Sequence, residues 1–90
     1  MEKHTKVYLE YFPSHSGFYH CEICNKQATE IHHIKRRSEF GTKEKHLQDI
    51  IENLIALCRS CHQKAHANIF TKDYLTDIHN KNIQMYSTQF

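Results

Sequence analysis

All four cysteines of this chain fall into two Cys-x-x-Cys pairs, Cys21/Cys24 and Cys58/Cys61, and this spacing restricts the possible folds strongly. Two such pairs supply the four soft thiolate ligands that close a tetrahedral structural zinc site. A chain of 90 residues supports one domain and buries little apolar surface, so a bound metal would help to stabilise it. We therefore expect a single small domain built around Zn²⁺ held by four thiolates.

Two alternative uses of the cysteines remain open but explain less. Disulfides or a redox pair would leave the repeated spacing unexplained, and disulfides within each pair would close loops too short to stabilise the fold much. A mixed finger formed by the first pair with His62 and His66 would need a connector far longer than a zinc finger has. Reduced thiols, no secretory signal and no long apolar run together predict a cytoplasmic protein without a membrane span.

The segment between the two cysteine pairs predicts a strand, a polar loop and a second strand. Residues Gln27–Ile34 alternate loosely between apolar and polar, which predicts a strand with His32 and His33 on opposite faces. Residues 35–48 are polar and charged, which predicts a mobile loop. The apolar run Asn53–Leu57 predicts a second strand that pairs with the first.

A helix is predicted directly after the second strand. The segment Arg59–Ala67 contains helix formers and neither glycine nor proline. His62 and His66 are separated by four positions, so they would share one helical face and could bind one metal ion. A helix in this segment would therefore present two ligands of a single ion.

The flanking segments are predicted to support this core, which we place at residues 21–68. Residues 1–20 are expected to form a packing segment that is either strand or short helix. Residues 69–90 are expected to form a support helix capped by Thr71, followed by a polar tail from Asn80 without a readable pattern. The remaining histidines are expected at the surface: His4, His15, His20, His46 and His79.

Positive charge gathers near the candidate metal ligands, although the net charge of +2 is too small to identify a polyanionic partner. Arg36 and Arg37 follow the histidine pair, and Arg59 and Lys64 follow the second cysteine pair. Each could be ordinary surface charge. Their common neighbourhood favours contact with phosphate groups.

The predicted strand, loop, strand and helix form a ββα unit, and the chain resembles the HNH endonuclease family. The resemblance covers about residues 21–68 and rests on four segments in the same order and spacing. These are Cys21-Glu22-Ile23-Cys24, Ile31-His32-His33-Ile34, Asn53-Leu54-Ile55-Ala56-Leu57-Cys58 and Arg59-Ser60-Cys61-His62-Gln63-Lys64-Ala65-His66. The resemblance implies an α+β fold, a small zinc-stabilised ββα-metal domain with flanking helices.

The resemblance also implies roles for individual residues. His33 matches the general base, and Asn53 matches the residue that braces the loop and the base by hydrogen bonding. His32 takes the position of the first ligand of a catalytic divalent ion, His62 matches the principal ligand on the helix, and His66 matches an additional histidine ligand. One departure from the common pattern is histidine instead of aspartate at position 32. An all-imidazole set favours Mn²⁺, Ni²⁺, Co²⁺ or Zn²⁺ over the oxygen-seeking Mg²⁺.

The expected function is metal-dependent hydrolysis of DNA phosphodiester bonds, by nicking or by cutting both strands, which leaves a 5′ phosphate and a 3′ hydroxyl. Two alternatives stay open. The chain could be a zinc-stabilised nucleic-acid-binding module without activity. It could instead be the nuclease subunit of a larger phage or mobile-element complex, activated by a protein partner.

Overall fold

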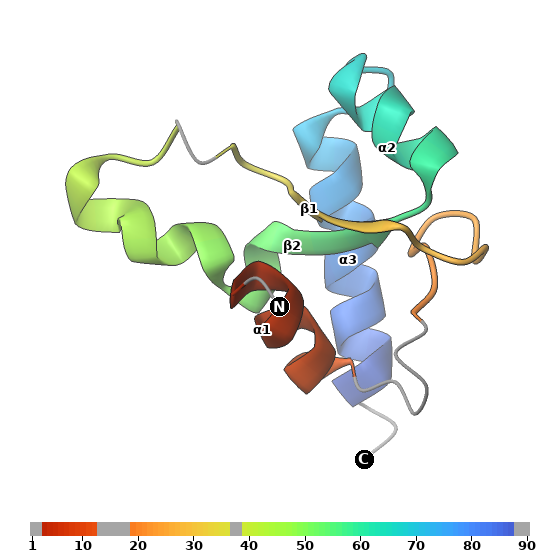
Figure 1. The fold of residues 1–90 in the computed structure, drawn as a ribbon, viewed down its shortest axis with the longest axis horizontal. Helices are drawn as coiled ribbons and strands as arrows, with labels where there is room; N and C mark the ends of the chain where they lie inside the picture. Colours follow the sequence, from red (N-terminus) through yellow and green to blue (C-terminus); the bar gives the residue numbers. More distant parts are fainter. Residues whose placement is uncertain (1–2, 13–18, 37–38, 88–90) are drawn as a thin grey trace.

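The computed structural model describes residues 3–12, 19–36 and 39–87, and it places helices on both faces of a two-stranded sheet (Figure 1). β1 (Glu30–His33) and β2 (Leu54–Leu57) pair antiparallel. α1 (Lys3–Tyr11) covers one face of the sheet, and α2 (Arg59–His66) and α3 (Lys72–Ser87) cover the other. The expected α+β class with flanking helices is confirmed.

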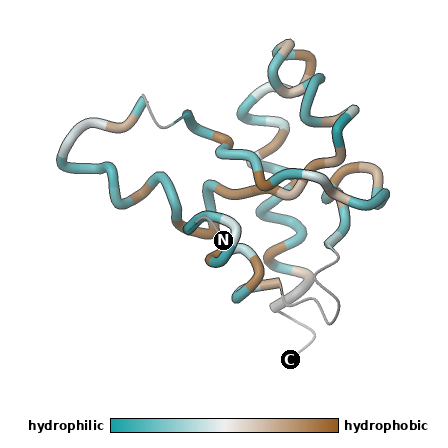
Figure 2. The backbone as a smooth tube through the Cα atoms, in the orientation of Figure 1, coloured by the Kyte–Doolittle hydropathy of each residue, from teal (hydrophilic) through white to brown (hydrophobic). Residues whose placement is uncertain are grey.

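β2 lies at the centre of the molecule and is buried on both faces. Its side chains alternate between two apolar clusters: Leu54 and Ala56 pack with Tyr8 of α1, whereas Ile55 and Leu57 pack with Leu75 of α3. Alternation of this kind follows from the two-residue period of a strand. Figure 2 shows β2 as a hydrophobic stretch between more hydrophilic segments. The apolar run that predicted this strand is therefore a strand covered from both sides.

The long segment between the strands differs from its prediction. The predicted loop at residues 35–48 contains most of a 3₁₀ helix, η2 (Thr42–Asp49), and a second one, η3 (Ile51–Asn53), includes Asn53, where the second strand was expected to begin. In Figure 1 the part that carries η2 extends away from α2. η2 has no buried residue, so it lacks the apolar periodicity by which a sequence reveals a helix.

α3 also differs from its prediction, because it continues through residues that were expected to form an irregular tail. Thr71 caps it as expected, since the backbone N–H of Tyr74 donates to Thr71 Oγ1 at 3.1 Å. The helix then runs to Ser87, well past Asn80. Within the described ranges no helix, α3 included, is both long and apolar enough to cross a membrane.

The full length of α3 was not predicted because part of the face that it buries is polar. His79, expected at the surface, is fully buried, and this expectation is wrong. Its Nδ1 lies 2.8 Å from Glu22 Oε1, and its Nε2–H donates to the backbone oxygen of Ile51 at 2.5 Å. Both ring nitrogens therefore lie within hydrogen-bonding distance of an oxygen atom.

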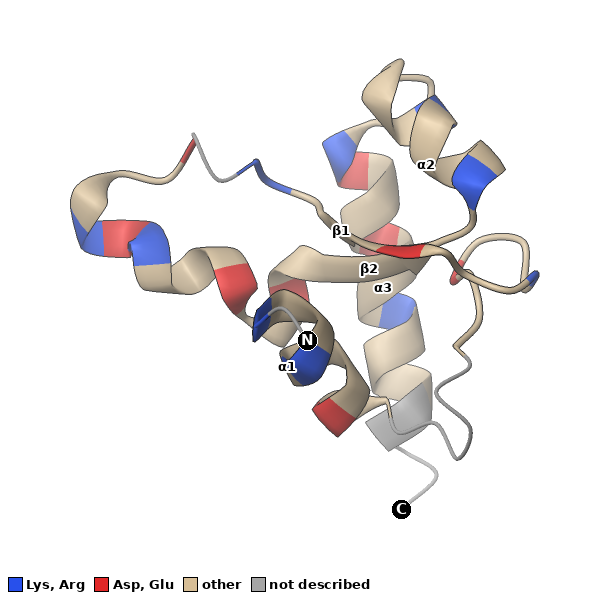
Figure 3. Cartoon of the chain, viewed as in Figure 1, with Lys and Arg blue, Asp and Glu red and all other residues tan. Residues whose placement is uncertain are grey.

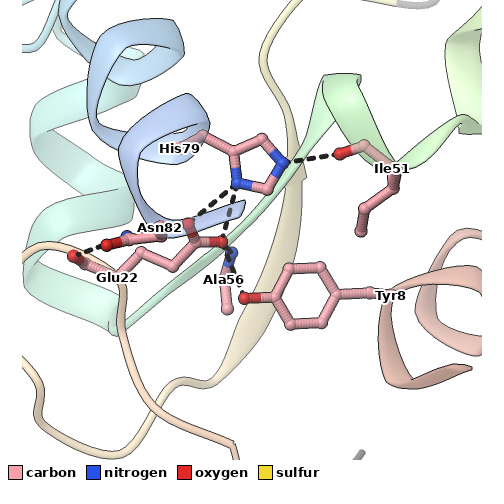
Figure 4. A network of polar contacts seen from close by, with 6 residues as sticks. All are labelled: Tyr8, Glu22, Ile51, Ala56, His79 and Asn82. Atoms are coloured by element: carbon pink, nitrogen blue, oxygen red, sulfur yellow. Dashed lines mark hydrogen bonds and ion pairs between the residues drawn. The ribbon is translucent and has the colours of Figure 1, made fainter. Parts of the chain in front are cut away.

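Glu22 is the centre of a buried network that joins four elements of the fold (Figure 4). Its carboxylate also accepts from Tyr8 Oη at 2.7 Å, from the Ala56 backbone at 3.2 Å and from Asn82 Nδ2 at 3.1 Å. Burial is the main cause that raises the pKa of Tyr8, so its hydroxyl stays protonated and donates. The network ties the first cysteine pair to α1, β2 and α3.

Loss of His79 should therefore destabilise the protein strongly. We expect His79→Leu to lower the free energy of unfolding of the zinc-loaded protein by about 3–5 kcal/mol, because it leaves the buried Glu22 carboxyl group and the Ile51 carbonyl without the ring that bonds to both. The measurement is urea denaturation followed by circular dichroism. His46→Leu is the matched control, since His46 is exposed on η2. A loss below about 1 kcal/mol, the value of an exposed ion pair, would contradict this account.

Candidate active site

The four cysteines converge at one point between the β1–β2 sheet and α2. Their Sγ atoms all lie within 4.8 Å of one another, and Cys24 Sγ is 3.5 Å from Cys58 Sγ. Four sulfurs at about 2.3 Å from a tetrahedral zinc would be about 3.8 Å apart. The described geometry therefore fits a structural zinc site, with Cys24 exposed and the other three cysteines buried.

The local backbone explains why these thiols converge. Asn25 adopts a left-handed conformation with φ of 66°, which turns the chain back so that its N–H donates to Cys21 O at 3.0 Å. Cys58 directly follows β2 and caps α2, where its Sγ accepts from the backbone N–H of Cys61 at 3.5 Å. This hydrogen bond is the largest cause that lowers the pKa of the Cys58 thiol to about 7.

A second cluster is formed by three histidines on the sheet face that α2 covers. The Nε2 atoms of His62 and His66 are 3.1 Å apart. The ring of His32 lies 5.0 Å from that of His62 and 5.6 Å from that of His66. Two ligands at about 2.1 Å and 90° on one ion are about 3.0 Å apart, so this spacing suits a shared divalent metal.

Hydrogen bonding and burial leave His62 and His32 with nitrogen lone pairs that could bind a metal. Glu30 Oε2 is 2.9 Å from His62 Nδ1, so Nδ1–H donates to the carboxylate and the lone pair lies on Nε2, toward His66. Burial, followed by the charges of His62 and His66, lowers the pKa of His32 to about 4. His32 is therefore neutral at neutral pH, and a neutral imidazole is the form that binds a metal.

His33 lies on the opposite face of β1, as the strand period predicts. His33 pairs with Leu54 across the sheet and faces α1, where the His4 ring lies at 4.7 Å. Its Nε2 is 2.8 Å from Asp49 Oδ1, so Nε2–H donates to the carboxylate. This contact leaves the lone pair on Nδ1, which can accept a proton.

Asn53 braces the segment that joins the two strands. Its Oδ1 accepts from the Lys35 backbone at 2.8 Å, and its Nδ2 donates to the backbone oxygens of Lys35 and Gln48 at 3.1 and 2.9 Å. The side chain therefore fixes the end of η2 at Gln48, next to Asp49. Asn53 is therefore connected to His33 through Asp49.

The cations expected to contact DNA have different surroundings. Arg36 is exposed and borders a small cavity of about 30 Å³ together with His32 and His66. Arg59 is exposed at the start of α2, and Lys64 Nζ lies 5.6 Å from the centre of the Phe70 ring. Arg37 lies outside the described residues. Figure 3 shows Lys and Arg on α2 and just after β1, whereas η2 carries both signs.

Three residues near the histidines were not predicted from the sequence: Glu30, His4 and Asp49. Glu30 had a usable signal, because it precedes His32 by two positions and must share its strand face. His4 and Asp49 had no signal in the sequence that could be used. His4 lies on a segment whose conformation was undecided, and Asp49 directly follows the predicted loop at residues 35–48, in a stretch for which no element was predicted.

Comparison with known proteins finds a family model that matches the part of the chain that carries these clusters. A sequence model described as HNH endonuclease matches residues 21–68, which include both cysteine pairs and the candidate histidines at positions 32, 33, 62 and 66. A mitochondrial DNA mismatch repair protein mutS homolog from Sarcophyton glaucum is 40% identical over 48 residues, which make up 53% of this chain and 5% of that protein. No solved structure shows significant similarity. Because the matched region spans more than half of the chain, the protein belongs to the HNH endonuclease family.

Proposed function

We propose that this protein hydrolyses phosphodiester bonds of DNA, with His33 as the general base. The observation that supports this most directly is the environment of His33. Its Nε2–H donates to Asp49 at 2.8 Å, which holds the lone pair of Nδ1 ready to accept a proton from water. Membership of a family of endonucleases supports the same reaction.

The other residues of the site divide the remaining tasks among them. Asp49 holds the His33 ring in one tautomer and orientation, and Asn53 holds the backbone beside Asp49. His32, His62 and His66 would hold one divalent ion, and Glu30 orients His62 for this role. A bound ion there would stabilise the negative charge that develops on the phosphoryl oxygens and on the leaving oxygen.

The comparison with a known protein favours DNA as the substrate. It also favours a larger assembly as the setting in which this chain acts. The matched relative is named as a DNA mismatch repair protein, and the matched segment is a small part of its length. An HNH unit can thus occur beside much larger partner domains. We infer that this chain cuts DNA with weak sequence preference by itself and acquires specificity through another protein or through DNA structure.

A cleavage assay tests the proposed function. Zinc-loaded protein is incubated with supercoiled plasmid and Mg²⁺, Mn²⁺, Ni²⁺ or Co²⁺, with chelator-treated samples as controls. We expect nicked or linear products with 3′ hydroxyl ends, which a DNA polymerase extends. If the protein binds DNA but no metal supports cleavage, the alternative of a zinc-stabilised binding module without activity takes its place.

Loss of Asp49 should slow cleavage without weakening binding of DNA. We expect Asp49→Asn to lower kcat by about 10- to 100-fold, the usual cost of losing a carboxylate behind a functional histidine. An asparagine can rotate its amide and no longer fixes the His33 tautomer. KM should stay the same because Asp49 touches only protein. The control is Asp77→Asn, an exposed acid on α3, and a change in KM alone would contradict a positioning role.

Loss of Arg36 should weaken binding to all DNA sequences alike. Arg36 is exposed beside the His32 and His66 cavity, where a phosphate would approach the metal ligands. We expect Arg36→Ala to reduce the salt dependence of binding by about one phosphate contact. Fluorescence anisotropy at several salt concentrations measures this salt dependence. Lys81→Ala on α3 is the control. An unchanged slope would place Arg36 away from the phosphates.

A further inference from the structure

A second group of metal-binding side chains lies on the sheet face opposite the His32 cluster. His4 of α1, His33 of β1 and Asp49 of η2 each offer a ligand atom, and these atoms lie within 4.8 Å of one another. All three residues are partly buried. Three separate elements therefore converge on one point that is not part of the metal cluster described above.

The spacing within this group is that of ligands on one ion. The rings of His4 and His33 are 4.7 Å apart, which lies between the 4.4 Å and 5.0 Å that separate His62 from its two neighbours in the other cluster. His33 Nε2 and Asp49 Oδ1 are 2.8 Å apart, close to the edge of about 3.0 Å expected for neighbouring ligands at right angles. Replacement of the shared hydrogen by a metal would need only a small movement.

We propose that His4, His33 and Asp49 bind a second transition-metal ion and that this ion inhibits the enzyme. Two imidazoles and one carboxylate suit Zn²⁺, Co²⁺ or Ni²⁺, and they suit Mg²⁺ poorly because Mg²⁺ prefers oxygen ligands. The inhibition rests on the proposed role of His33 as general base. The binding of the ion does not depend on that role.

The inhibition follows from the structure of the imidazole ring. A neutral ring has one N–H and one nitrogen lone pair in its plane. When Nε2–H donates to Asp49, the lone pair is on Nδ1 and can accept a proton from water. A metal bound at Nε2 takes that nitrogen's lone pair, and the hydrogen moves to Nδ1. The ring then keeps its neutral charge but has no free lone pair, so it cannot act as a base.

The site can be tested by counting metal ions, without any cleavage. Co²⁺ is titrated into zinc-loaded protein, whose thiolates are already occupied, and binding is followed by calorimetry and visible absorption. We expect two Co²⁺ ions per chain in the parent protein and one in His4→Phe. Phenylalanine keeps a ring against His33 but has no ligand nitrogen, and circular dichroism checks that the variant is folded. His46→Phe, which replaces an exposed histidine on η2, should still bind two ions.

A second variant and a kinetic measurement complete the test. Asp49→Asn should weaken binding of the second ion by at least about tenfold, as expected when a carboxylate at a metal site is lost. Cleavage by the parent protein should rise and then fall as Co²⁺ increases, whereas cleavage by His4→Phe should rise to a plateau. Equal stoichiometry in the parent protein and in His4→Phe would refute the site.

The binding and cleavage results separate this proposal from the proposed function. If the parent protein binds two Co²⁺ ions, His4→Phe binds one and neither protein cuts DNA, the site stands and the nuclease proposal fails. If the parent protein cuts DNA but binds a single Co²⁺ ion, the nuclease proposal stands and the second site fails. If His4→Phe loses one ion but shows the same fall in rate at high Co²⁺, the inhibitory role is refuted.

Discussion

Replacement of His33 by alanine is expected to lower the rate of DNA cleavage by about 10²- to 10⁴-fold, the range that a general base contributes. The His33 ring is a base candidate whose tautomer is fixed by a carboxylate, through the 2.8 Å contact between Nε2 and Asp49 Oδ1. Alanine leaves water without a proton acceptor. Plasmid cleavage under single-turnover conditions measures the loss.

The rest of the molecule should be little affected by this substitution. His33 lies at the end of β1 and outside both apolar clusters, so zinc content and affinity for DNA should stay close to those of the parent protein. His46→Ala is the control for loss of an imidazole, because His46 is exposed on η2. Cleavage by His33→Ala at half the parent rate or more would rule out His33 as the base. Loss of zinc would indicate a structural role instead.

Replacement of Cys58 by serine is expected to unfold the protein. Cys58 directly follows β2, caps α2 and supplies one of the four sulfurs of the candidate zinc site, so one substitution would remove a metal ligand and a helix cap together. Structural zinc contributes about 10–16 kcal/mol in small zinc-binding domains, which matches or exceeds the total stability of an ordinary domain. Far-ultraviolet circular dichroism and zinc content measured by mass spectrometry should both report the loss.

Ser60→Ala provides the matched control for this experiment. Ser60 lies on α2 between Cys58 and Cys61 and is exposed, so its loss should leave zinc binding and helix content intact. Removal of zinc from the parent protein with a chelator should reproduce the spectrum of Cys58→Ser. A folded, zinc-containing Cys58→Ser protein would show that the other ligands hold the ion without it.

The elements that carry the histidines could be predicted because their signals are local. The apolar run at residues 54–57 predicts β2, and the four-residue spacing of His62 and His66 predicts that both face one side of α2. Adjacent positions in a strand predict that His32 and His33 diverge. The structure agrees with each of these three predictions.

Other parts could not be predicted because their stabilising contacts are polar or distant in sequence. His79 and Glu22 are separated by 57 positions, and each resembles a surface residue until the other is placed beside it. η2 has no buried side chain to create a periodic pattern. Asp49 reaches His33 only because this 3₁₀ helix and the bonds of Asn53 direct the chain there.

The position of His32 and His33 at neighbouring points of one strand has a consequence for how this protein can change. The two side chains exchange faces if β1 shifts by a single residue against β2, because the side-chain period of a strand is two. A one-residue deletion before His32 would then direct His33 toward α2 and its imidazoles, and carry His32 toward Asp49. Every residue of the site would still be present, and each histidine would stand in the place of the other. We therefore expect that, among sequences related to this protein, the length of the chain just before β1 varies less than the identity of the side chains in that segment.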